Sequence, residues 1–141
     1  MASPIPPLPP APNPGSVLVI EPDRPWAEAV CGALRDRGLA PASVATSEEA
    51  RWRLHERRFD LLILSTSADH GTFETLLHEL RDHGAPPPVL LIEDHRGGGF
   101  AEAWRFLRAA RTLRRPCRLR DVADAATSLI GRAGAERRAM A

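Results

Sequence analysis

The chain contains no lysine, because all 19 of its basic residues are arginine. Any function that requires a lysine ammonium group, such as a phosphate-binding loop that ends in lysine, is therefore excluded. Arginine retains the positive charge but carries it on a planar fork with five N–H donors, which suits carboxylate and phosphate groups equally. Electrostatic roles in this chain must therefore be performed by guanidinium groups.

Cysteine and long hydrophobic runs are also scarce. The two cysteines, Cys31 and Cys117, have no metal-ligand spacing, so we interpret them as reduced thiols of a cytoplasmic protein. No apolar run approaches the ~18 residues that span a bilayer. The N-terminal region lacks the basic and apolar segments of a secretory signal. These absences predict a chain with no membrane contact.

The remaining composition fits one domain with short tails. The chain has 141 residues, of which 43% are hydrophobic. Residues 1–15 hold seven prolines, which favours a disordered polyproline-like tail. Whether this tail is a solvated leader or a ligand for a proline-binding groove stays open. We expect the domain itself over residues 16–131 and a frayed C-terminal tail over residues 132–141.

Short apolar runs alternate with segments of helical periodicity along the domain. Strands are predicted at residues 17–20, 43–45, 61–64, 89–92 and 112–113. Thr46 and Glu49 form a capping box for the second helix, and Gly131 is expected to end the fifth. Five β/α repeats predict an α/β fold, a doubly wound (βα)5 flavodoxin-like parallel sheet with strand order 2-1-3-4-5. The ligand crevice should then lie near Glu21 and Ser65.

Over residues 16–131 the sequence resembles the response-regulator receiver (CheY-like) family. The resemblance lies in four segments at the ends of the predicted strands, VLVIEPD, FDLLILS, PPVLLIED and LRRPCRLRDV. It implies an acidic pair for Mg²⁺ after the first strand and an aspartate that accepts a phosphoryl group at the end of the third. It also implies a hydroxyl residue after the fourth strand and a Lys-Pro pair after the fifth.

This chain departs from the family pattern at nearly every one of these positions. The vestigial phosphoacceptor pocket comprises Glu21, Pro22, Asp23, Ser65, Glu93 and Arg115. Serine is a poor nucleophile without an adjacent base, and an ionised glutamate cannot donate a hydrogen bond to phosphate. The register of Glu21, Pro22 and Asp23 against the family's acidic pair stays open. We therefore expect a degenerate, single-domain pseudo-receiver with no enzymatic activity and no bound metal or cofactor.

The same charged residues have two interpretations. Glu21, Asp23 and Glu93 face Arg115 across the pocket and lock one state through a permanent ion pair, or they are solvated charges at the strand ends.

Charge is strongly polarised along the chain. Residues 1–95 carry 8 arginines against 14 acidic residues, whereas residues 96–141 carry 11 arginines against 4. Much of this excess falls on the fourth helix, the fifth strand and the start of the fifth helix, a surface that receivers commonly use for output or dimerisation. The arginines that we predict to bind a partner are Arg105, Arg108, Arg111, Arg114 and Arg118.

These features predict a phosphorylation-independent signalling adaptor of a two-component or phosphorelay system. Its partner would be a histidine kinase, a phosphotransferase or another regulator, and a homodimer through the same face is an open alternative. A second hypothesis is a sensor that binds cyclic di-guanylate (c-di-GMP) through these arginines. A third is a phosphoacceptor that uses a displaced acid such as Asp69. No segment resembles a DNA-binding domain, and a solvated face in an arginine-rich composition is the plainest alternative.

Overall fold

The computed structural model of the chain describes residues 15–65, 75–76, 78–79, 82, 87–93 and 111–139, with side chains up to residue 132. The expected N-terminal tail, residues 1–15, lies outside the described residues except for Gly15. Asp69, Arg105 and Arg108 also lie outside them.

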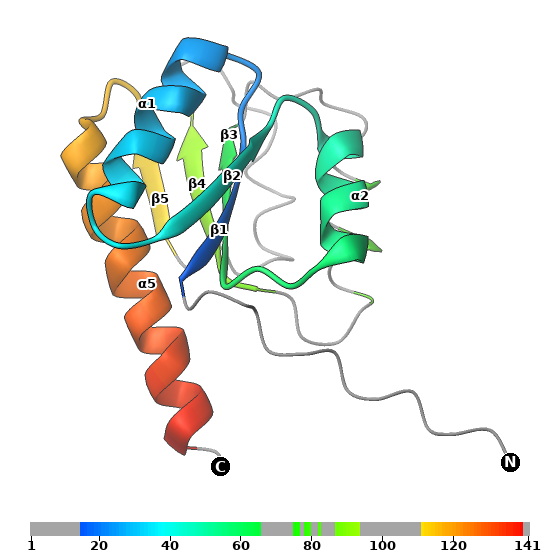
Figure 1. Ribbon diagram of the computed structural model, residues 1–141, viewed down its shortest axis with the longest axis vertical. Coiled ribbons are helices and arrows are strands. Elements are labelled where there is room, and N and C mark those ends of the chain that lie inside the picture. Colours follow the sequence, from blue (N-terminus) through cyan, green and yellow to red (C-terminus); the bar gives the residue numbers. More distant parts are fainter. Residues whose placement is uncertain are drawn as a thin grey trace, which may run out of the picture.

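Five parallel strands form one sheet in the order β2-β1-β3-β4-β5 (Figure 1). The strands are β1 (Ser16–Ile20), β2 (Ala40–Val44), β3 (Leu61–Ser65), β4 (Val89–Glu93) and β5 (Arg111–Arg114). This order confirms the predicted doubly wound parallel sheet of the flavodoxin-like type.

The sheet is buried on both faces because its central strands are continuously apolar. Alternate side chains of β1 point to opposite sides, so Leu18 and Ile20 join one core cluster and Val17 and Val19 join the other. Helices α1 (Arg24–Arg35) and α5 (Leu119–Ala139) contribute to the second cluster, and α2 (Ser47–Glu56) contributes to the first. The domain is thus a three-layer α/β/α arrangement.

Strand β2 begins earlier than the sequence predicted. Its expected residues were 43–45, but it spans Ala40–Val44 and pairs with β1 from Ser16 opposite Ala40 onward. Pro41 lies inside this strand and lacks the N–H that a ladder hydrogen bond needs. It is tolerated because β2 is an edge strand, so its missing N–H can face away from the sheet.

Helix α5 also differs from expectation. It does not end at Gly131 but continues to Ala139, so residues 132–139 are helical rather than a frayed tail. Each of the two glycines in this stretch, Gly131 and Gly134, costs only ~1 kcal/mol relative to alanine, and the Ala, Arg and Glu residues around them favour helix. Within the described part of the chain, neither α5 nor any other helix is long and apolar enough to cross a membrane.

Both helices that follow the first two strands begin at side-chain caps. Thr46 Oγ1 accepts a hydrogen bond from the Glu49 N–H at 3.2 Å, and Glu49 Oε2 accepts one from the Ala45 N–H at 3.3 Å. The capping box at Thr46 is therefore confirmed, although Glu49 reaches one residue before the cap. Asp23 caps α1 in a similar way, and Pro25 occupies its first turn. These caps fix how the chain leaves the carboxyl ends of β1 and β2.

Candidate functional site

The predicted pocket residues gather at the carboxyl ends of the parallel strands. Glu21 directly follows β1, Ser65 and Glu93 are the last residues of β3 and β4, and Arg115 directly follows β5. Because all five strands run in the same direction, these four positions lie along one edge of the sheet.

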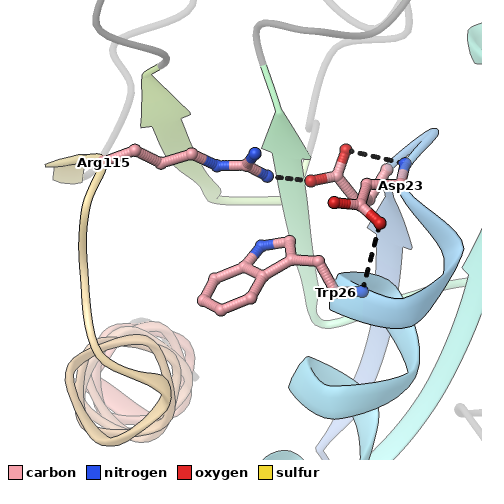
Figure 2. A network of polar contacts seen from close by, with 4 residues as sticks. Asp23, Trp26 and Arg115 are labelled. Atoms are coloured by element: carbon pink, nitrogen blue, oxygen red, sulfur yellow. Dashed lines mark hydrogen bonds and ion pairs between the residues drawn. The ribbon is translucent and has the colours of Figure 1, made fainter.

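An ion pair between Glu21 and Arg115 dominates this edge (Figure 2). Arg115 Nη2 donates to Glu21 Oε1, which joins the end of β1 to the end of β5 across the two intervening strands. The Glu21 side chain is only 2% exposed, whereas that of Arg115 is 23% exposed. A carboxylate buried to this degree requires a cationic or hydrogen-bonded partner to remain ionised.

Trp26 supports the guanidinium group from the side of α1. The guanidinium carbon of Arg115 lies 5.4 Å from the centre of the Trp26 ring, which is within the range of a cation–π interaction. Figure 2 shows Arg115 extending from the loop after β5 across the Trp26 ring toward the β1 end. In the described part of the structure, Nε of Arg115 is buried without a hydrogen-bond partner. Arg115 is therefore held by one carboxylate and one aromatic ring.

Of the three carboxylates in the ion-pair hypothesis, the described structure pairs Glu21 with the Arg115 guanidinium and engages Asp23 and Glu93 with other residues. Asp23 Oδ1 accepts a hydrogen bond from the Trp26 N–H at 3.4 Å, as the cap of α1. Glu93 Oε2 lies 3.6 Å from Nε of Arg114, whose side chain is 83% exposed. Pro22 is exposed and separates Asp23 from Glu21. Local helix capping and strand alternation thus redirect both carboxylates.

Ser65 occupies the position that the resemblance assigns to the phosphoacceptor. It is 2% exposed and pairs with Ile92 in the register of β3 and β4. Its hydroxyl group is therefore enclosed at the strand end rather than presented to solvent.

The acidic residues at the β1 end do not fit a Mg²⁺ site. Mg²⁺ requires near-octahedral oxygen ligands and retains several waters. Glu21 is enclosed with its carboxylate on Arg115, and Asp23 is engaged as a helix cap. Among the residues that the structure describes, no group of three or more His, Cys, Asp or Glu side chains is arranged to hold a metal ion.

The described part of the Arg-rich face consists of Arg111, Arg114 and Arg118, and all three are exposed. Arg111 and Arg114 lie on β5, and Arg118 directly precedes α5. Arg105 and Arg108 were assigned to the same face and lie outside the described residues. Arg115 belongs to the same run of sequence but turns inward to Glu21.

Trp26 is the site residue that the sequence did not reveal. It packs from α1 against the second core cluster, as an apolar helix residue commonly does. Its contact with Arg115 joins residues 89 positions apart, for which no local pattern exists.

Comparisons with known proteins were made by sequence and by structure. No protein-family model matches the chain, and no curated protein matches it in sequence. Solved structures do match. A signal receiver domain from Vibrio parahaemolyticus superposes with a TM-score of 0.80 at 19% identity, covering 92% of this chain and 98% of that one.

Two further solved structures also match over most of both chains at low sequence identity. A CheY-like response regulator receiver domain protein from Methanospirillum hungatei gives a TM-score of 0.77 at 13% identity, covering 86% of this chain and 97% of that one. A response regulator receiver protein from Burkholderia phymatum gives 0.69 at 23% identity, with 82% and 94% covered. Together with the strand order, these likenesses establish that the chain has the fold of response regulator receiver (CheY-like) domains.

Proposed function

We propose that this chain is a phosphorylation-independent signalling adaptor that binds a protein of a two-component or phosphorelay system through its Arg-rich face. The observation that carries the proposal is the enclosed ion pair of Glu21 and Arg115. In a phosphorylated receiver the corresponding carboxylate would hold Mg²⁺ and the corresponding cation would hold the phosphoryl group. Here the two groups neutralise each other.

The remaining pocket residues support the same conclusion. A serine hydroxyl stands at position 65, enclosed at the end of β3, where the receiver family carries the aspartate carboxylate that accepts the phosphoryl group. A glutamate at position 93 would repel a phosphoryl group rather than donate a hydrogen bond to it. No phosphoryl-transfer step is therefore assigned to this pocket, and signalling would depend on binding alone.

The first test concerns phosphorylation. The protein is incubated with acetyl phosphate and Mg²⁺, and its intact mass is recorded before and after treatment with hydroxylamine. We expect no adduct, and Ser65→Asp alone should also fail to form one because Glu21 and Arg115 still neutralise each other. A stoichiometric, hydroxylamine-labile phosphoryl adduct on the unaltered protein would refute phosphorylation independence.

The second test concerns the Arg-rich face. Arg114→Glu/Arg118→Glu reverses two exposed charges of this face, and Arg24→Glu reverses an exposed arginine on α1 as a matched control. Affinity capture from native lysate should recover a two-component signalling protein with the unaltered chain and with the control, but not with the double variant. Equal recovery by a folded double variant would place the binding surface elsewhere.

The same variants separate a protein adaptor from a cyclic di-guanylate sensor. Exposed guanidinium groups also suit phosphate groups, which is why this ligand is worth testing. Calorimetry should show no heat of binding for cyclic di-guanylate. Micromolar binding that the Arg114→Glu/Arg118→Glu variant abolishes would instead favour the sensor.

A further inference from the structure

Trp52 is an unusual surface residue. Within the described part of the chain it is the large hydrophobic side chain that remains mostly exposed, at 68%. It lies in the middle of α2, whose buried residues Ser47 and Ala50 face the sheet. Exposed tryptophan is rare and is enriched at sites where a partner covers its ring.

Acidic side chains flank Trp52 along the helix. Glu48 and Glu56 lie four residues before and after it, so they occupy the same face of α2, and both are exposed. Neither forms an ion pair with another described residue. Arg51 and Arg53 lie about 100° from Trp52 around the helix and three residues from Glu48 and Glu56. Arg51 pairs instead with Glu79, at 2.6 Å. We call Trp52, Glu48 and Glu56 the α2 patch.

Two charged side chains lie at helix ends where the interaction with the helix dipole is unfavourable. Glu56 is the last residue of α2, where the helix dipole is negative, and Arg120 is the second residue of α5, where it is positive. Each is a like-charge placement that local stability does not explain. An opposite charge from another surface would relieve both.

The chain itself carries the complementary surface. Arg111, Arg114 and Arg118 are exposed at β5 and the start of α5, and cations of this kind bind both carboxylates and the face of a tryptophan ring. The strand order places β2, with α2 packed against it, and β5 at opposite edges of the sheet. Figure 1 shows α2 and the β5–α5 region on opposite sides of the molecule. One molecule therefore cannot bring the two surfaces together.

We propose that the α2 patch docks the Arg-rich face of a second copy of this chain, with an arginine of one copy over Trp52 of the other and its neighbours against Glu48 and Glu56. The contact joins unlike surfaces, so it is heterologous, and each added copy leaves one free surface at each end. The α2 patch comprises one ring and two flanking carboxylates, so we expect the association to be weak and transient.

This inference rests on the proposed function in one respect, because it uses the Arg-rich face as a docking surface and names a second occupant for it. A signalling partner and a second copy would then compete for the same arginines. Self-association would hold the face covered until a tighter partner displaces it.

The test is sedimentation velocity of the full chain from about 10 μM to about 1 mM at low salt, a range suited to weak complexes. The weight-average sedimentation coefficient should rise with concentration without a plateau at the dimer, and it should fall when salt is raised. Trp52→Ala should weaken the association about thirtyfold, the scale of a desolvated cation–π contact. Trp52 is exposed enough that this variant is expected to fold normally.

A mixing experiment makes the pairing specific. The α2-neutral variant is Trp52→Ala/Glu48→Gln/Glu56→Gln, and the β5-neutral variant is Arg114→Gln/Arg118→Gln. Each alone should be monomeric because it has lost one of the two surfaces. An equimolar mixture should form a 1:1 complex and stop there, since each variant supplies the surface that the other lacks.

The matched control is Arg24→Gln/Glu28→Gln, which removes an exposed ion pair of α1 and should associate like the unaltered chain. A monomer at every concentration, or a mixture that stays monomeric, would overturn the inference. If the monomeric chain still loses its signalling partner on Arg114→Glu/Arg118→Glu, the proposed function stands alone. If the chain self-associates but captures no signalling partner, the self-association stands and the proposed function fails.

Discussion

The two charged groups of the Glu21–Arg115 pair differ in how easily they can reach solvent. Glu21 is 2% exposed and fixed at the end of a buried strand, whereas Arg115 is 23% exposed on a long side chain. Removing one partner of a buried pair is costly mainly because the other charge remains buried and uncompensated. The cost of breaking this pair should therefore depend on which residue is changed.

Arg115→Met should destabilise the protein by about 3–5 kcal/mol, because it leaves the Glu21 carboxylate enclosed without its cation. Glu21→Gln should cost only about 1 kcal/mol, since the Arg115 guanidinium can turn toward solvent. The double variant Glu21→Gln/Arg115→Met should be more stable than Arg115→Met alone. Urea unfolding measures all three, and equal costs for the two single variants would contradict this asymmetry.

Cys31 gives a second residue-scale prediction, on pH. Burial raises the pKa of this thiol above its ordinary value of 9.0, against the smaller effects of a hydrogen bond with Ser43 and the charge of Arg35. The folded chain therefore retains the thiol proton to a higher pH than the unfolded chain does. The resulting stability is complete below about pH 9 and is lost as pH rises toward the folded-state pKa.

The stability difference between the unaltered chain and Cys31→Ala should accordingly shrink as pH rises through this range. Denaturant unfolding at about pH 7.5 and about pH 10 measures that difference. Cys117 has a pKa raised mainly by burial as well, but it is present in both proteins and so cancels. A difference that stays constant with pH would show that the Cys31 thiol ionises equally in both states.

At the scale of elements, one glycine lies inside α5 and another follows α1, and replacing each by alanine should have opposite effects on stability. Gly131 lies inside α5, and a Cβ at this position would meet no atom within 4 Å. Gly38 follows α1 with a φ of +79°, a conformation that costs an L-residue about 1–2 kcal/mol. Gly131→Ala should therefore stabilise the protein by ~1 kcal/mol, whereas Gly38→Ala should destabilise it by a similar amount.

Thermal unfolding of these two variants also tests where α5 ends. If the helix stopped at Gly131, that glycine would take the left-handed conformation of a C-cap, and alanine there would destabilise the protein as it does at position 38.

The sequence predicted best the elements whose pattern is local. β1, β3 and β4 are short continuous apolar runs, and their interiors were identified to within one residue at either end. β2 was displaced because its start depends on pairing with Ser16, and the presence of Pro41 is acceptable only at a sheet edge. The length of α5 was underestimated because glycine signals a helix end only when its backbone turns left-handed, which the sequence does not specify.

The candidate site was predictable in its members but not in its pairing. Glu21 and Arg115 were named from their positions after the first and fifth strands, and the strand order brings them to one edge. The sequence could not determine which of three carboxylates Arg115 would meet. That choice depends on the cap formed by Asp23 and on the outward position of Arg114 beside Glu93, both of which are set by backbone geometry.

At the scale of the whole molecule, contacts around Gly15 tie the first described residues to the folded domain. Asp60 Oδ2 accepts hydrogen bonds from the backbone N–H groups of Gly15 and Ser16, each at 2.9 Å. Gly15 has a φ of +86°, and a Cβ there would lie 2.7 Å from a methyl carbon of Leu39. Gly15 is thus held against the folded domain, whereas the rest of the predicted tail of residues 1–15 lies outside the described residues.

Deleting residues 2–13 should leave the free energy of unfolding within about 0.5 kcal/mol of its original value. The reason is that, among the described residues, Gly15 and Ser16 already tie the start of the domain to Asp60, and that the prolines of the deleted segment offer few N–H groups for pairing. Asp60→Ala is the informative contrast. It removes the acceptor from two partly buried N–H groups while leaving the tail intact, and it should cost about 1–3 kcal/mol. Urea unfolding compares the two variants directly. A truncated protein destabilised as much as Asp60→Ala would mean that the proline-rich segment itself packs on the domain, and the fold would then have to include it.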